Sequence, residues 1–203
     1  MKKQLFTVIM ASAGMLFSGM VVAADKFEAA HNASFQAKGI ASLDRLNQDE
    51  TQKFCSTPET FSGKGDAKMR AKIEKQNLAM VKLPSNGNYF GSWKEGEKIA
   101  QSGRGVTWSD KADSEIGGGC YNCHQIDKKE ISYGSIGPSL LNYGKIRGNG
   151  KEVIEYTWGK IYNSKAYNAC SNMPRFGHMH LLTEDQIRHI MSLLLDPNSP
   201  VNQ

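Results

Sequence analysis

The sequence predicts an all-α protein, and two segments in its C-terminal half are the strongest observations behind this prediction. The first spans Lys151 to Tyr162, where one face repeats at helical spacing through Val153, Ile154, Thr157, Trp158, Ile161 and Tyr162. The second begins at Thr183, which forms a capping box with Gln186, continues as an apolar stripe, and ends before Asp196-Pro197. Both patterns are typical of helices that bury one face.

The start of the chain predicts a secretory signal peptide over residues 1–24. Two lysines precede an apolar stretch from Leu5 to Val22, and two alanines stand directly before Asp25. A membrane anchor is the rival interpretation, because the apolar stretch approaches the length that spans a bilayer. The small residues followed at once by polar sequence favour cleavage, and no later stretch is long and apolar enough to span.

Residues 25–88 are predicted to form an N-terminal helical extension. Its expected helices lie within 25–39, over 42–54 with Ser42 as cap, and over 66–83 with Met69, Ile73 and Met80 on one side. The Pro-Ser-Asn-Gly-Asn sequence at 84–88 breaks the helical pattern, so we place a domain boundary there, and residues 89–203 form the second domain. The extension contains too few apolar residues to build a large core alone.

The second domain is expected to open with a helix over Ser92–Gln101 that has Gly96 in its middle. A glycine inside a helix costs about 1 kcal/mol relative to alanine. A close crossing with another helix would explain its presence, and the last helix of the chain is the expected partner.

The charge balance excludes one class of partner. The chain has 25 Lys and Arg against 20 Asp and Glu, and the basic residues form no long run. This excess is too small to indicate a nucleic-acid-binding protein. A mildly basic face could still attract an acidic protein partner.

The second domain contains Cys120-Tyr121-Asn122-Cys123-His124, a C-x-x-C-H motif. This is the attachment signature of a c-type haem, in which each cysteine sulfur adds to a vinyl group and the histidine becomes the proximal iron ligand. A carbonyl in the turn at 137–140 could accept the other ring N–H of His124 and fix its orientation. Combined with export, the motif indicates the bacterial periplasm, where thiols are oxidised.

Two other uses of a C-x-x-C pair fit the residues less well. A zinc site would need a second ligand pair at finger spacing, whereas Cys55 and Cys170 are single and far away. A thioredoxin-like pair would need a strand-to-helix context, whereas three glycines at 117–119 precede this motif.

A haem iron needs a second axial ligand for electron transfer, and Met173 is the predicted one. It stands directly before Pro174, which lacks an N–H donor and stiffens the chain. A thioether opposite a histidine raises the reduction potential. The alternatives lie a few residues downstream and are His178, Met179 and His180.

The two remaining cysteines, Cys55 and Cys170, are predicted to form a disulfide. In an oxidising compartment this bond would close a long loop and contribute about 4 to 5 kcal/mol in the chain-entropy model. The alternative is that Cys170, close to Met173, is a reactive or iron-binding thiol. Arg175 and Arg147 could neutralise haem propionates, but a solvated face is the commoner place for an arginine, so neither is counted among the site residues.

The order of these features resembles a class I cytochrome c domain: a helix with a central glycine, the haem motif, G-P-S-L, an aromatic helix, N-M-P-R-F-G and a capped last helix. More narrowly, five stretches resemble the SoxX family, the small monohaem subunit of the SoxAX complex of sulfur-oxidising bacteria. They are Ile136–Leu140, Tyr162–Ser164, Tyr167–Gly177, Leu193–Pro197 and Ser199–Asn202. The resemblance covers about half of the chain, from the haem motif to the C-terminus.

The resemblance implies a role as an electron-accepting subunit. Cys120 and Cys123 would hold one haem c, and His124 and Met173 would ligate its iron. In this family a SoxA partner forms the heterodimer and handles thiosulfate, and the complex joins thiosulfate to a cysteine of the SoxYZ carrier. SoxX passes the electrons to a soluble cytochrome, so no catalytic residue is implied in this chain.

Two further classes of function stay open. One is a free-standing, diffusible cytochrome c that exchanges electrons with several partners. The other is an enzyme in its own right, such as a thiosulfate dehydrogenase, which would require an open haem site or a reactive Cys170.

Overall fold

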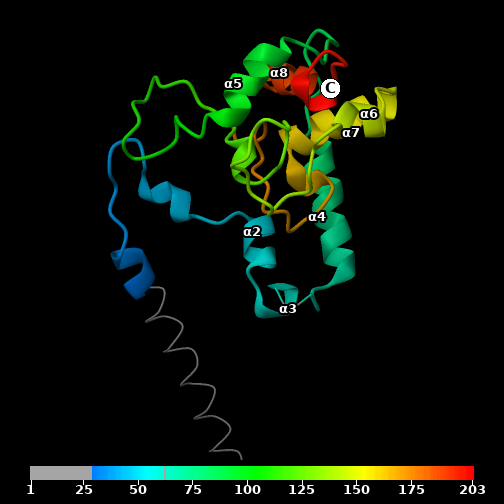
Figure 1. The fold of residues 1–203 in the computed structure, drawn as a ribbon. Coiled ribbons are helices and arrows are strands. Elements are labelled where there is room, and N and C mark those ends of the chain that lie inside the picture. The colour runs from blue at the N-terminus through cyan, green and yellow to red at the C-terminus, as the bar shows by residue number, and fades with distance from the viewer. Residues whose placement is uncertain (1–28, 62) are drawn as a thin grey trace, which may run out of the picture. The chain divides into compact units, whose positions relative to one another are not determined.

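The structure is a computed structural model that describes residues 29–61 and 63–203 (Figure 1). The predicted signal peptide lies outside the described residues. Contacts divide the chain into two compact units, of which one ends at Asn47 and the other spans Gln48–Gln203. The units therefore divide after Asn47, not at the expected boundary after residue 88.

The described part of the first unit is small. Residues 29–33 are helical, Lys38 and Ala41 form an isolated bridge, and the 3-10 helix η1 spans Leu43–Leu46. The single helix expected over 42–54 is wrong. It is replaced by η1 and a separate helix α2 (Glu50–Cys55), because Asp49 forms its own capping box with Gln52 and starts a new helix there.

Helices build the second unit, and its described residues contain no strand, which confirms the all-α prediction for this part of the chain. After α2 the order is α3 (Pro58–Phe61), α4 (Ala67–Ala79), α5 (Trp93–Gln101), η2 (Cys120–Asn122), α6 (Tyr143–Arg147), α7 (Lys151–Tyr162), η3 (Ser164–Ala166), α8 (Glu184–Leu195) and η4 (Pro200–Asn202). Among the described helices, none has the length and apolarity needed to cross a membrane.

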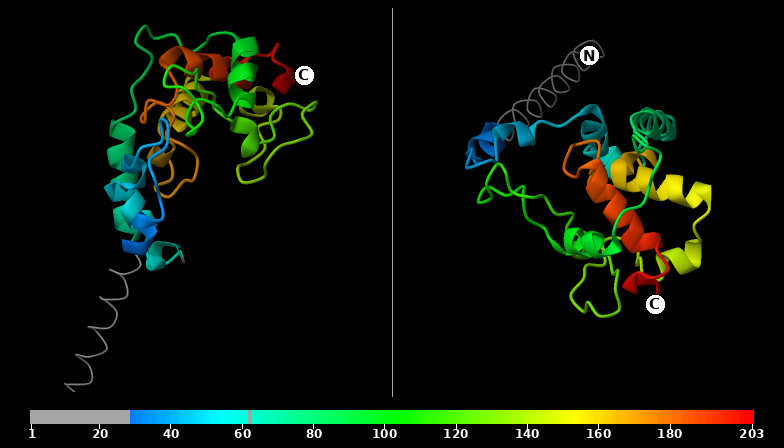
Figure 2. Two further views of the ribbon diagram at one scale, coloured as in Figure 1. Left: turned by 90° about the vertical axis from the view of Figure 1, so that its left-hand side faces the viewer. Right: turned by 90° about the horizontal axis from the view of Figure 1, so that it is seen from above.

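The α5 and α8 helices cross closely, as the views in Figures 1 and 2 show. A Cβ added at Gly96 would lie 2.2 Å from the His189 carbonyl oxygen and 3.0 Å from the Leu193 Cβ. The crossing expected from Gly96 is therefore confirmed. The capping box of Thr183 and Gln186 also starts α8 as predicted.

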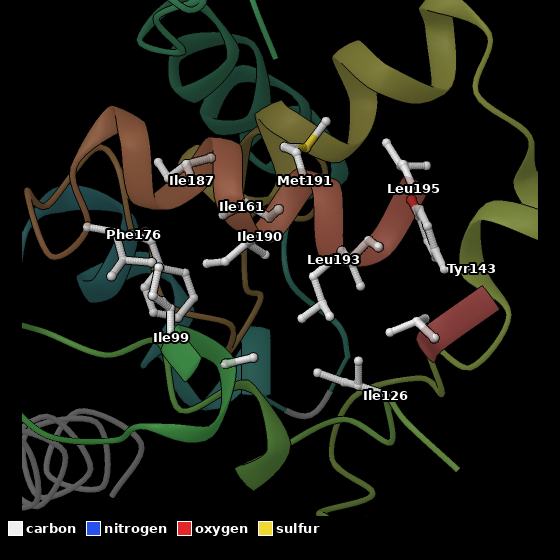
Figure 3. Close-up of a cluster of buried hydrophobic side chains, with 14 of the residues drawn as sticks. Ile99, Ile126, Tyr143, Ile161, Phe176, Ile187, Ile190, Met191, Leu193 and Leu195 are labelled. Carbon is white, nitrogen blue, oxygen red and sulfur yellow. The ribbon is translucent and has the colours of Figure 1, made fainter. Parts of the chain in front are cut away.

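The hydrophobic core surrounds α8 (Figure 3). Its buried side chains come from α5, α7, α8 and the loops between them, and include Ile99, Ile126, Ile161, Phe176, Ile187, Ile190, Met191 and Leu193. The core thus joins helices that are far apart in the chain and borders the C-x-x-C-H motif.

The α4 helix is shorter than the segment 66–83 that the sequence predicts. It is capped by the Asp66 side chain and ends at Ala79, with Met80 as its C-cap. Ile73 is buried as expected, but the second buried residue is Asn77, while Met69 and Met80 are exposed. The polar side chain lies inside because it bonds to another buried amide, as described below.

Candidate functional site

Three glycines turn the chain back along the end of α5 and so deliver the C-x-x-C-H motif. Gly118 N–H donates to the Ile99 carbonyl and Gly119 N–H to the Ser102 carbonyl, each at 2.8 Å. A Cβ at Gly117 would lie 2.0 Å from the Ser102 oxygen, so no larger residue fits there. Gly119 has a φ of 55°, a left-handed conformation that glycine adopts without strain.

The motif itself is a tight turn. The N–H groups of Cys123 and His124 both donate to the Cys120 carbonyl, at 3.1 and 2.9 Å. Cys120 and Cys123 are not disulfide-bonded. Burial raises the pKa of the Cys120 thiol to about 12. Because a redox-active pair works through a thiolate, this environment does not suit the thioredoxin-like alternative.

The His124 ring is fixed by the turn that follows the motif. Its Nδ1 lies 2.7 Å from the Pro138 carbonyl oxygen, which confirms the expected hydrogen bond. With Nδ1–H donating to this oxygen, Nε2 keeps the lone pair that a metal ion needs. A Cβ at Gly137 would come within 2.2 to 2.7 Å of the ring atoms, so glycine is required for this close approach.

An apolar cavity of about 40 Å³, partly open to solvent, lies between the motif and α8. Cys120, His124 and Met173 line it together with apolar side chains of α5, α7, α8 and the loops. Cys123 is not among the lining residues, although it is one turn from Cys120. The structure thus brings together three of the four predicted haem-site residues around one space.

Met173 is presented to the cavity by its own loop. The Met173 N–H donates to the Ser171 hydroxyl at 3.2 Å, and the Ser164 hydroxyl donates to the Met173 carbonyl at 2.5 Å. The alternative ligands His178, Met179 and His180 do not line the cavity, and 51% of the Met179 surface is exposed.

Cys55 and Cys170 form a disulfide, as predicted, with an S–S distance of 2.09 Å. The alternative of a free, reactive Cys170 thiol is wrong for this structure, because the sulfur is already bonded. The bond ties α2 to the loop that carries Met173.

The sequence favours a solvated face for Arg175, but the structure buries this residue. Its side chain is only 7% exposed and forms an ion pair with Asp49, N to O 2.6 Å. Burial opposes ionisation of Asp49, but hydrogen bonds from the Gln52 backbone and Arg175 outweigh it and lower its pKa. Nothing in the sequence pairs these residues, which are far apart in the chain. The Arg147 guanidinium instead lies 5.8 Å from the Tyr143 ring centroid.

Within the motif, the Tyr121 hydroxyl donates to the Glu97 carboxylate of α5 at 3.0 Å. Burial raises the pKa of Glu97, and this effect exceeds the opposing one of its bonds to Tyr121 and Gln101. Sequence reasoning missed this pair. It joins α5 to the motif.

The sequence is similar to that of a known protein. No protein-family model matches the sequence. Over 159 residues the chain is 38% identical to a protein of Aquifex aeolicus (strain VF5) named "Uncharacterized lipoprotein". The aligned region covers 77% of this chain and 73% of that protein. The chain therefore belongs to the same family as this uncharacterized Aquifex aeolicus lipoprotein.

Proposed function

We propose that this chain is a c-type cytochrome that holds one covalently attached haem and transfers electrons. The observation that carries the proposal is that Cys120, His124 and Met173, from distant parts of the sequence, line the same apolar cavity. The apolar lining suits the largely apolar faces of the haem macrocycle.

The donor set also fits this group. Among the described residues, no three His, Cys, Asp or Glu side chains gather as they would around a bare metal ion. The cavity instead offers one imidazole and one thioether, which is the axial pair that cytochromes c provide to an iron held by the macrocycle.

Each residue has a defined task in this proposal. Cys120 and Cys123 would hold the haem through two thioether bonds, and the Pro138 carbonyl orients the His124 ring so that Nε2 could bind its iron. Met173 would be the second iron ligand. When bound, the haem supplies an iron that gains or loses one electron at a potential that the methionine raises. Because His124 and Met173 would both bind the iron, no residue of this chain is proposed as catalytic.

The arrangement supports a class I cytochrome c fold, in which α5 crosses the last helix α8 and the motif follows α5. Together with the resemblance of residues 167–177 to SoxX, it supports a role as the electron-accepting subunit of a SoxAX complex in thiosulfate oxidation. The partners would be a SoxA-type subunit, the SoxYZ carrier through the complex, and a soluble acceptor cytochrome.

A periplasmic location is part of the proposal. The disulfide and the relative's name, a lipoprotein, both support a place outside the cytoplasm.

Expression with a c-type haem maturation system in the periplasm tests the haem assignment. We expect haem that stays on the polypeptide after denaturation, with one haem per chain by mass spectrometry. The double variant Cys120→Ser with Cys123→Ser should lose covalent haem, whereas Cys55→Ser with Cys170→Ser should keep it. A purified wild-type chain without covalent haem would refute the assignment.

Native purification tests the partner assignment. A one-to-one complex with a second cytochrome from thiosulfate-grown cells would support the SoxAX role. A monomer that exchanges electrons freely would favour the diffusible carrier, and thiosulfate turnover by the isolated chain would favour the enzyme.

A further inference from the structure

The loop that carries Met173, residues 163–177, is held by α2 on both sides of the methionine. Cys170 precedes Met173 and is bonded to Cys55, the last residue of α2. Arg175 follows Met173 and pairs with Asp49, the N-cap of the same helix. The short helix α2 is therefore bonded to this loop both before and after the predicted ligand Met173.

The α4 helix supports the same loop at two further points. The Glu74 carboxylate accepts the Ala169 N–H at 3.0 Å. The Asn163 amide donates to the Asn77 side-chain oxygen at 3.0 Å, and both residues are buried. The loop is thus attached to the extension along its length, and only one of these attachments neutralises a buried charge.

That attachment is the ion pair of Asp49 and Arg175. A second cation, Lys165, is buried in the same loop and donates to the carbonyl groups of Ala169 and Ser171. Asp49 attracts both cations. A buried guanidinium that loses its carboxylate is strongly disfavoured and moves toward water if the chain allows it.

Such a movement would affect Met173 directly. Only Pro174 separates Arg175 from Met173, and the proline ring restricts how far the backbone can rotate between them. A displacement of Arg175 is therefore passed on to the methionine.

We propose that Asp49 is a positioning residue for Met173, which it holds at the cavity by keeping Arg175 buried. This inference rests on the proposed haem site. It assigns the extension a role inside the chain, as the support of the second axial ligand.

The test uses the haem-loaded full chain and two readouts that report the iron ligand. These are the reduction potential and the far-red absorption band that a thioether bound to ferric iron produces. Asp49→Asn keeps a side-chain oxygen for the Gln52 N–H but removes the charge. We expect it to lose most of the band and to lower the potential, because methionine ligation raises the potential. Asp49→Glu should restore both.

The matched control is Asp66→Asn. Asp66 is also an N-cap in the extension, and its side chain accepts the N–H groups of Lys68 and Met69 at the start of α4. This variant should keep the band and the potential of the wild type.

A double variant separates charge from folding. In Asp49→Asn with Arg175→Leu the buried guanidinium next to Met173 is gone, and Lys165 keeps its bonds to the Ala169 and Ser171 carbonyls, so the loop should return and the band should reappear. If Asp49→Asn alone does not fold, a folded double variant with the band supports the proposal and one without the band overturns it.

The remaining outcomes are also decisive. A wild-type band that persists in Asp49→Asn overturns the positioning role and leaves the haem proposal intact. A haem-loaded wild type without the band overturns the positioning role together with the Met173 assignment. A wild type that binds no haem overturns the proposed function itself.

Discussion

At the residue scale, the candidate site depends on the small size of Gly137 and on which ring nitrogen of His124 carries the proton. The His124 ring stacks so closely on Gly137 that a methyl group there would meet three ring atoms. The Pro138 carbonyl then selects the ring tautomer. Glu97 affects the site in a different way, because burial raises the pKa of its carboxyl group.

The pH dependence of stability should reveal the raised pKa of Glu97. Burial raises its pKa in the folded state above its unfolded value, so its contribution to stability is fully present below the unfolded pKa and is lost as pH rises through the folded pKa. We expect Glu97→Gln to unfold at a higher urea concentration than wild type at pH 7, with the difference closing toward about pH 4.

Glu95→Gln in the same helix is the control for this series. Its hydrogen bond to Lys98 lowers the pKa of Glu95, so its removal should not stabilise the protein at pH 7. Urea unfolding of all three proteins between pH 4 and 8 makes the comparison. Equal midpoints for wild type and Glu97→Gln at pH 7 would contradict the prediction.

At the element scale, the contact of α5 with α8 sets one wall of the cavity. Ala100 of α5 and Ile190, Leu193 and Leu194 of α8 line that space, so the distance between the two helices also sets its width. Gly96 allows the short distance because its missing side chain leaves room for the His189 carbonyl.

Gly96→Ala should therefore destabilise the protein, although alanine is the better helix former by about 1 kcal/mol. Overpacking costs about 1 to 3 kcal/mol, so we expect a net loss of stability in denaturant unfolding. Lys94→Ala, at an exposed position of the same helix, should change stability little. A Gly96→Ala variant as stable as wild type would mean that the helices separate without cost.

At the scale of the whole unit 48–203, the disulfide connects elements separated by 115 residues. It joins α2 to the loop 163–177 that carries Met173, which explains why residues 48–88 of the extension belong to the same compact unit as the motif. A bond that closes so long a loop restricts the unfolded chain more than the folded one.

Removing this bond should cost about 2 to 5 kcal/mol of the free energy of unfolding. The double variant Cys55→Ala with Cys170→Ala, unfolded in urea at pH 7, measures this cost against the oxidised wild type. Reduced wild type serves as the control and should unfold with the variant. Coincident curves for variant and oxidised wild type would show that the bond adds no stability.

The sequence by itself determined the features whose cause is local. The spacing of side chains over 151–162 and the capping box at Thr183 predict α7 and α8 at their observed positions, because a few neighbouring residues decide where a helix begins and ends. It also identified the C-x-x-C-H motif. The disulfide could be predicted because only two cysteines remained.

Only the tertiary structure decided which side chains meet across the chain. Sequence left Met173 beside three rival ligands, and the packing of its loop against the core puts Met173 at the cavity wall. No sequence pattern indicates that Arg175 is buried against Asp49. The helical spacing put Met80 on the same side of α4 as the buried Ile73, whereas the structure exposes it. These outcomes depend on contacts between residues far apart in sequence, which arise only when the helices have packed together.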